Sequence, residues 1–221
     1  MWYNITNKRY AQGGITKMPE RRTIYLDHAA TSGKKAPGVA DAAAAYLRET
    51  AVNVNRSTYA LSSDVAMRVL RCRELLADRF RFDSPTHVVF TPGQTAGLNM
   101  VIKGLCIRDS IKGLLRPGDR VLVSSMEHNA VMRPLKQLER LIGITIDRVP
   151  CAPDGTLRAE DILPWLHANT RLAVLTHASN VCGTLLPVEQ IGALLYARGV
   201  PFVLDAAQTA GHVPIDFHAL H

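Results

Sequence analysis

Several polar side chains in this sequence directly follow apolar runs, at the points where strands would end. Asp205 comes immediately after the run Val200–Leu204, and Gln208 lies just beyond it. In an open parallel sheet, ligands bind in the crevice outside the carboxyl ends of the strands. We therefore expect Asp205 to meet a ligand. The alternative is that its carboxylate only caps the segment that follows.

The stretch Val88–Asn99 combines an apolar run, a glycine-containing turn and the start of a helix at Gln94 and Thr95. Backbone N–H groups and the positive end of a helix dipole favour a phosphate there, and the Thr95 hydroxyl is an additional donor. Ordinary capping by Thr91 or Thr95 is the alternative. The stretch lacks both the Gly-x-Gly-x-x-Gly spacing and the Gly-Lys-Ser/Thr of a P-loop. A nucleotide-binding sheet domain is therefore disfavoured, and we expect a ligand with a single phosphate.

Two further loops place polar side chains after apolar runs. His128 follows Val121–Ser124. Its imidazole could stack on an aromatic ligand or exchange protons near physiological pH, and a surface loop histidine is the alternative. Asn180 follows Leu172–Thr176 and could donate to a ligand oxygen, with an Asx turn as the alternative. Taken with Asp205, these features predict a planar, phosphorylated aromatic cofactor whose ring nitrogen a carboxylate keeps protonated, so that the ring becomes an electron sink.

Strand-like apolar runs alternate with helical patterns along most of the chain. We expect strands at about 23–27, 87–90, 120–124, 144–149, 171–176 and 200–205, and helices at about 37–50, 62–80, 94–105, 131–142, 159–168 and 188–198. Such alternation with short loops predicts an α/β fold, a three-layer sandwich around a mostly parallel sheet. The expected domains are a basic tail (1–22), an arm with helices (23–80) and a cofactor-binding sheet domain (81–221).

Composition excludes several classes of protein. The 221 residues carry a formal net charge of +7, but the basic residues are scattered, so nucleic-acid binding is not indicated. No apolar run is long enough to cross a bilayer, and the polar first twenty residues do not resemble a secretory signal. The four cysteines form no Cys-x-x-Cys pair, so no zinc site or disulfide framework is expected. We expect a cytoplasmic protein with reduced thiols, and Cys182 as a small packed residue.

Five ordered motifs carry a resemblance to a known family. They are Tyr25-Leu-Asp-His-Ala-Ala-Thr31, Thr91-Pro-Gly-Gln-Thr95 with Asn99, Met126-Glu-His-Asn129, Thr176-His-Ala-Ser-Asn-Val-Cys-Gly-Thr184 and Asp205-Ala-Ala-Gln-Thr209. Over residues 23 to 221, the chain resembles the class V aminotransferase family of fold-type I pyridoxal-phosphate enzymes. Within that family it is most similar to the cysteine desulfurases and related lyases. The resemblance implies pyridoxal 5'-phosphate as the cofactor.

The resemblance also implies a role for each matching residue. Asp205 would pair with the pyridine nitrogen, and His128 would stack on the ring as a catalytic residue. The phosphate would be held by Gln94 and Thr95. The ring hydroxyl would be bonded by two amide side chains, those of Asn180 and Gln208. Arg56 lies in a segment that resembles the loop reaching the partner subunit's site, and it would contact the substrate.

The implied activity is conversion of cysteine to alanine, with sulfur passed on as a persulfide. A homodimer and a sulfur-acceptor protein are implied as partners. An aminotransferase, a selenocysteine lyase or an epimerase of the same fold is the near alternative. The family's Schiff-base lysine would follow Asp205, but no lysine follows Lys136 in this chain. We therefore expect a chain truncated before that lysine and inactive alone. A non-catalytic truncated product with exposed apolar surface is the second alternative.

Overall fold

The computed structural model describes residues 24–54, 59–105 and 115–221. The chain divides into two compact units, Met1–Gly33 and Lys34–His221. This division does not coincide with the three expected domains, whose boundaries remain predictions. None of the helices in the described ranges is long and apolar enough to cross a membrane.

The described part of the first unit, residues 24–33, is an irregular segment that folds around Tyr25. The Tyr25 hydroxyl lies 2.8 Å from the carbonyl oxygen of Asp27 and 2.9 Å from that of Thr31. The strand expected at 23–27 is wrong for its described residues, which have no regular secondary structure. A strand needs a neighbour to bond its backbone, and the named strands of the described chain pair only with one another.

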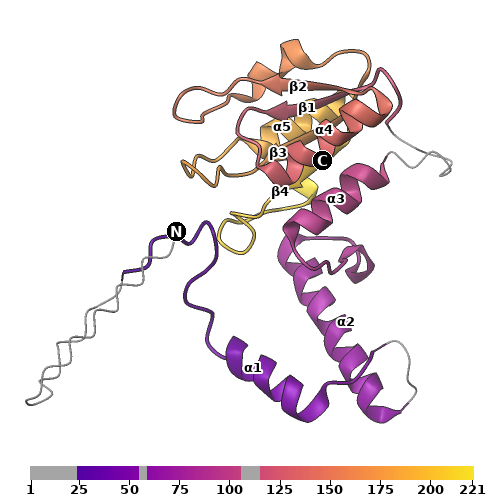
Figure 1. The fold of residues 1–221 in the computed structure, drawn as a ribbon, viewed down its shortest axis with the longest axis vertical. Helices are drawn as coiled ribbons and strands as arrows, with labels where there is room; N and C mark the ends of the chain where they lie inside the picture. Colours follow the sequence, from indigo (N-terminus) through magenta and orange to yellow (C-terminus); the bar gives the residue numbers. More distant parts are fainter. Residues whose placement is uncertain (1–23, 55–58, 106–114) are drawn as a thin grey trace, which may run out of the picture. The chain divides into compact units, whose positions relative to one another are not determined.

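Every helix and strand of the described residues belongs to the second unit (Figure 1). Its helices are α1 (Val39–Ala45), α2 (Ala60–Phe80), α3 (Gln94–Gly104), α4 (Asn129–Ile142) and α5 (Val188–Ala197). Shorter turns of 3-10 or π type are η1 (Tyr46–Thr50), η2 (Pro85–His87), η3 (Ala159–Trp165) and η4 (His218–Leu220). The strands are β1 (Arg120–Ser124), β2 (Thr145–Val149), β3 (Thr170–Thr176) and β4 (Phe202–Asp205).

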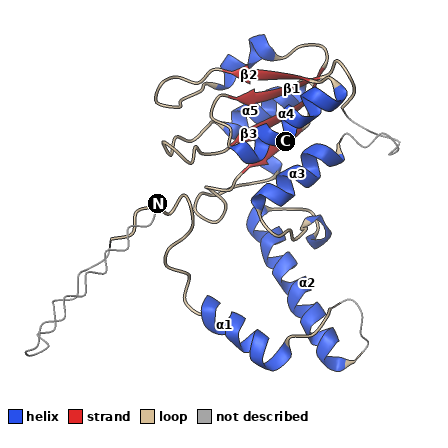
Figure 2. Ribbon diagram, viewed as in Figure 1, coloured by secondary structure: helices blue, strands red, loops and turns tan. Residues whose placement is uncertain are grey.

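The four strands lie side by side in one parallel sheet, in the order β2-β1-β3-β4 (Figure 2). Alternate residues of β1 belong to two separate cores. Val121 and Val123 pack in a cluster with residues of α3 and α4, whereas Leu122 packs with residues of η3 and α5. Because both faces of the sheet are covered, β1, β3 and β4 each contain an unbroken apolar run, whereas the edge strand β2 also carries Asp147 and Arg148. The expected three-layer α/β sandwich is confirmed.

Helix α4 shows how local sequence sets an element that positions the site. His128 caps its first turn, and apolar residues at helical spacing, among them Val131 and Leu135, are fully buried. Gly143 ends the helix in the left-handed region at φ 76°, where its N–H bonds the carbonyl oxygen of Glu139 at 3.2 Å. The cap at one end and the glycine at the other fix where the chain enters from β1 and leaves toward β2.

Two other predicted elements differ from the structure. The strand expected at 87–90 is wrong: Pro85–His87 is a short 3-10 turn, and residues 88–90 join no strand of the described sheet. Val88 has the backbone angles of a strand but no neighbouring strand to bond, and the side chains of Val89 and Phe90 are exposed. The helix expected at 159–168 is a 3-10 helix that ends at Trp165, with Pro164 inside it.

An apolar groove of about 550 Å³ runs beside β4. It is lined by Phe202 and Leu204 of β4, by Phe80 at the end of α2, and by Val88 and Phe217. On its other side β4 bonds β3, and among the described strands β4 has no second neighbour. The groove and the free edge of β4 together leave apolar surface exposed to solvent.

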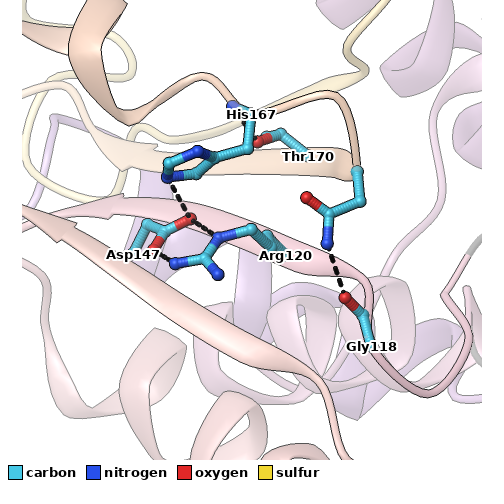
Figure 3. A network of polar contacts seen from close by, with 6 residues as sticks. Gly118, Arg120, Asp147, His167 and Thr170 are labelled. Atoms are coloured by element: carbon cyan, nitrogen blue, oxygen red, sulfur yellow. Dashed lines mark hydrogen bonds and ion pairs between the residues drawn. The ribbon is translucent and has the colours of Figure 1, made fainter.

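A polar network joins the start of β1, the middle of β2 and the start of β3 (Figure 3). Arg120 of β1 donates through Nε to Oδ2 of Asp147 on β2 at 2.6 Å, and its Nη2 bonds the other carboxylate oxygen. Nε2 of His167 lies 3.9 Å from Asp147 Oδ2, and the His167 backbone N–H bonds Thr170 Oγ1 at 2.9 Å. The network therefore crosses β2, β1 and the start of β3.

Candidate active site

Asp205 is the last residue of β4 and is 3% exposed. Its Oδ1 accepts a hydrogen bond from Nε2 of Gln94 at 2.7 Å and one from the backbone N–H of Ala207 at 3.0 Å. The bond from Ala207 is the local cap that we considered as an alternative. The bond from Gln94 joins the end of β4 to the start of α3 across 111 residues. One carboxylate therefore serves as a cap and as a link between two predicted ligand-binding segments.

The start of α3 lacks a side-chain cap. Gly93 precedes the helix, and the Thr91 hydroxyl bonds the carbonyl oxygen of Gly93 at 3.1 Å instead of accepting from a helix N–H. Capping by Thr91 is therefore wrong. Thr95 lies exposed in the first turn. Backbone N–H groups that no side chain caps, at the positive end of an 11-residue helix, are suited to an anion.

His128 is exposed, but its ring is held in place. Nδ1 of His128 accepts a hydrogen bond from the backbone N–H of Ala130 at 3.1 Å and so caps α4. With Nδ1 as an acceptor, a neutral ring carries its proton on Nε2. His128 is thus an exposed residue at the end of the loop between β1 and α4, as in the alternative of a surface loop histidine, and its stacking on a ligand stays a prediction.

The two amide residues follow their strands, as expected. Asn180 is exposed in the loop after β3, and Gln208 is partly buried in the turn after β4. The Asx-turn alternative for Asn180 is not supported, because the backbone N–H of Cys182, which such a turn would use, bonds Ser179 Oγ at 3.4 Å. Asp205 and Gln94 are in direct contact, whereas the roles of Asn180 and Gln208 remain predictions. Arg56 lies outside the described residues.

Cys182 differs from the expectation of a packed thiol. It is exposed in the loop between β3 and α5, and its Sγ lies 3.3 Å from Thr184 Oγ1. Hydrogen bonds with Ser179 and Thr184 lower the pKa of the Cys182 thiol to about 7. The loop lies outside both apolar clusters of the sheet, so no core encloses the side chain.

Glu127 is a residue of this edge that sequence reasoning missed. Its Oε1 accepts from Ser124 Oγ at 2.6 Å and from the backbone N–H of Thr176 at 3.0 Å. Burial raises the pKa of the Glu127 carboxyl to about 7. A glutamate just before a helix is common on exposed surfaces, where it favours the helix dipole, so sequence alone offers no signal for this burial.

Comparison with known proteins connects this arrangement to one family. The sequence model described as Aminotransferase class-V matches residues 24–221. The chain is 30% identical over 197 residues to a probable cysteine desulfurase of Halalkalibacterium halodurans, and 33% identical over 196 residues to a cysteine desulfurase of Serratia proteamaculans. Each alignment covers 89% of this chain and 47% of the relative. The chain thus spans about half the length of these relatives.

Solved structures agree with the sequence comparison. The apo cysteine desulfurase of Thermococcus onnurineus NA1 superposes with a TM-score of 0.81 at 28% identity, over 90% of this chain and 47% of that one. The structure of SspA in complex with cysteine gives a TM-score of 0.79 at 29% identity, over 90% of this chain and 55% of that one. With the family match extending over nearly the whole sequence, the chain belongs to the class V aminotransferase family.

Proposed function

We propose that this chain forms the cofactor-binding part of a pyridoxal-phosphate-dependent cysteine desulfurase. The observation that carries the proposal is the hydrogen bond between Gln94 and Asp205. It brings the uncapped start of α3, suited to a phosphate, next to the carboxylate expected to face a ring nitrogen. The similarity to cysteine desulfurases in sequence and in structure supports the same assignment.

The residues at this edge fit pyridoxal 5'-phosphate. The first turn of α3 has no side-chain cap that would compete with a phosphate, and Thr95 is exposed beside it. Asp205 is buried and is held in one orientation by two donors, which suits a carboxylate that pairs with a single ring nitrogen. Two polar atoms near this edge, Glu127 Oε2 and His177 Nδ1, are buried and have no hydrogen-bond partner among the residues that the structure describes.

Each residue then has a defined task. The N–H groups and hydroxyl at the start of α3 hold the phosphate, and Asp205 holds a proton on the ring nitrogen by favouring its charged form. His128, with its proton on Nε2, presents a fixed ring that can stack and exchange that proton. Asn180 and Gln208 bond the ring hydroxyl. When bound, the cofactor supplies an electron sink that weakens bonds at the substrate's α-carbon and the adjacent carbon.

The complete reaction cleaves the carbon–sulfur bond of cysteine, releases alanine and passes the sulfur to a cysteine thiol as a persulfide. The complexed amino acid in SspA supports cysteine as the substrate. From the family resemblance we infer a cytoplasmic homodimer with a sulfur-acceptor protein, in which Arg56 contacts the substrate. An aminotransferase, a selenocysteine lyase or an epimerase would share the cofactor residues and differ in substrate.

The test of cofactor binding uses pyridoxamine 5'-phosphate, which binds without a lysine because it carries an amine in place of the aldehyde. Equilibrium dialysis of the 221-residue chain should show one site per chain. Asp205→Asn should weaken binding, whereas Asp78→Asn, at an exposed carboxylate on α2, should leave it unchanged. Equal affinity of the Asp205→Asn and wild-type chains would contradict the assignment of the ring-nitrogen carboxylate.

A second candidate is a cofactor-binding chain that is not catalytic by itself. It is favoured by the position of every lysine before β2 and by the apolar groove beside β4. Intact mass of the protein from its native source, after borohydride treatment, distinguishes the two. A heavier chain with one reduced cofactor adduct supports the desulfurase, and cysteine is then the first substrate to assay. A mass of 24.2 kDa without an adduct supports the non-catalytic chain.

A further inference from the structure

Glu127 lies in the turn between β1 and α4 and joins the carboxyl ends of two neighbouring strands. Its Oε1 accepts from the hydroxyl of Ser124, the last residue of β1, at 2.6 Å. The same oxygen accepts from the backbone N–H of Thr176, the last residue of β3, at 3.0 Å. The side chain of Glu127 therefore ties the turn that carries His128 to the end of β3 as well as to the end of β1.

The second carboxyl oxygen of Glu127 has a different environment. Oε2 is buried and has no hydrogen-bond partner among the described residues. An anionic oxygen in that position would be costly, because burial removes water and nothing replaces it. A proton on Oε2 removes the charge and leaves both bonds to Oε1 intact, since Oε1 only accepts. Burial is accordingly the main reason that the pKa of Glu127 rises to about 7.

The neighbouring titratable groups give Glu127 no counter-ion. Asp205 lies one strand beyond, in register with Thr176, and its like charge also raises the pKa of Glu127. His128 is exposed and uses Nδ1 to cap α4. His177 follows Thr176, and burial lowers the pKa of its imidazole, which favours the neutral ring. None of the groups that shift the titration of Glu127 is a cation.

We propose that Glu127 is a positioning residue that works as a neutral acid, with its proton on Oε2. In this form it ties the end of β1 to the end of β3 and holds the His128 ring at the edge of the sheet. It also leaves Asp205 as the single negative charge of the pair, facing the cationic ring. The role of His128 and Asp205 toward that ring rests on the proposed function, whereas the protonation of Glu127 does not.

The first measurement is a carbon-13 NMR titration of the chain labelled at its glutamate carboxyl carbons. One glutamate signal should titrate near pH 7. It should be absent in Glu127→Gln and present in Glu160→Gln, which removes an exposed carboxylate on η3. If the signal lost in Glu127→Gln instead titrates in the ordinary range of glutamate, the neutral-acid role is overturned.

The second measurement follows the His128 imidazole signals, assigned by their loss in His128→Gln. Glu127→Ala removes the acceptor for Ser124 and Thr176 and should displace these signals. Glu127→Gln keeps an acceptor oxygen and should restore them. Displacement of the His128 signals in a folded Glu127→Gln chain would overturn the positioning role, and this variant decides the question even where Glu127→Ala does not fold.

Neither measurement requires a bound cofactor. Failure of the wild-type chain to bind pyridoxamine 5'-phosphate, together with a glutamate that titrates near pH 7, would remove the proposed function and keep the proposal for Glu127. Binding of pyridoxamine 5'-phosphate, together with a Glu127 signal that titrates in the ordinary range of glutamate, would keep the proposed function and overturn the proposal for Glu127.

Discussion

The two ends of the same four strands handle buried charge in opposite ways. Toward the amino end, the guanidinium of Arg120, the first residue of β1, bonds both carboxylate oxygens of Asp147, which lies in the middle of β2 and is 3% exposed (Figure 3). At the carboxyl end, Glu127 Oε2 and His177 Nδ1 are buried without partners among the described residues. The first arrangement, which we call the closed end, pairs its buried charge, whereas the second, the open end, holds buried polar atoms without hydrogen-bond partners. Perturbed and incompletely paired groups are typical of functional sites.

The largest effect on stability should come from removing the buried ion pair of Arg120 and Asp147 at the closed end. Asp147→Ala leaves Arg120 partly buried without its partner and should lower the free energy of unfolding by about 3 kcal/mol or more. Chemical denaturation measures the loss. The matched control is Glu74→Ala on α2, whose pair with Arg71 is exposed and should cost less than about 1 kcal/mol. Similar losses in the two variants would remove the distinction between a buried and an exposed pair.

Glu127 should give the open end a pH dependence that the closed end lacks. Its pKa is about 7 in the folded chain and near 4.5 when unfolded, so the folded state binds the extra proton between these values. The contribution of this proton to the free energy of unfolding is complete below pH 4.5 and is lost as pH rises through 7. The loss amounts to at most about 3 kcal/mol. Urea unfolding from pH 5 to 8 should show this slope in the wild type and a shallower slope in Glu127→Gln. Identical slopes would contradict the raised pKa.

Asp205 tests the open end as a binding site. Asp205→Asn keeps an acceptor oxygen for Gln94 and Ala207, so the free energy of unfolding should change little. Loss of the charge should weaken pyridoxamine 5'-phosphate binding by about 1.5–3 kcal/mol, or roughly 10- to 150-fold. The matched variant at the other end is Asp147→Asn. It should lower the free energy of unfolding and leave the affinity of the folded chain for pyridoxamine 5'-phosphate unchanged. The opposite pattern would reverse the roles assigned to the two ends.

Thr95 should produce the smallest effect. Its exposed hydroxyl adds one neutral donor to the backbone N–H groups at the start of α3. Thr95→Ala should therefore weaken pyridoxamine 5'-phosphate binding by about 0.5–1.5 kcal/mol, or roughly two- to twelve-fold. The same variant should bind pyridoxamine, which lacks the phosphate, as the wild type does. A loss of affinity for both ligands would place Thr95 outside the phosphate site.

The sequence by itself determined the order along the chain of the four strands of the sheet and the edge to which the candidate site is assigned. Apolar runs such as Val121–Val123 and Leu172–Leu175 identify buried strands from local pattern alone, and parallel strands bring the residues that follow them to one edge. Asp205 and His128 could therefore be predicted as site residues. The strand predicted at 87–90 was wrong, because a strand depends on a neighbour that local pattern does not supply.

Only the tertiary structure decided which atoms meet. The bond between Gln94 and Asp205 spans 111 residues, and the Glu127 contact with Thr176 depends on β1 lying beside β3. The burial of Glu127, which raises the pKa of its carboxyl, likewise involves segments distant in the chain, among them the ends of β3 and β4. The pKa of Cys182 is instead lowered by Ser179 and Thr184 of its own loop. The local sequence pattern indicates whether a residue lies on the buried or the exposed face of its helix or strand. Desolvation and hydrogen bonding depend on the full set of neighbours, which folding alone brings together.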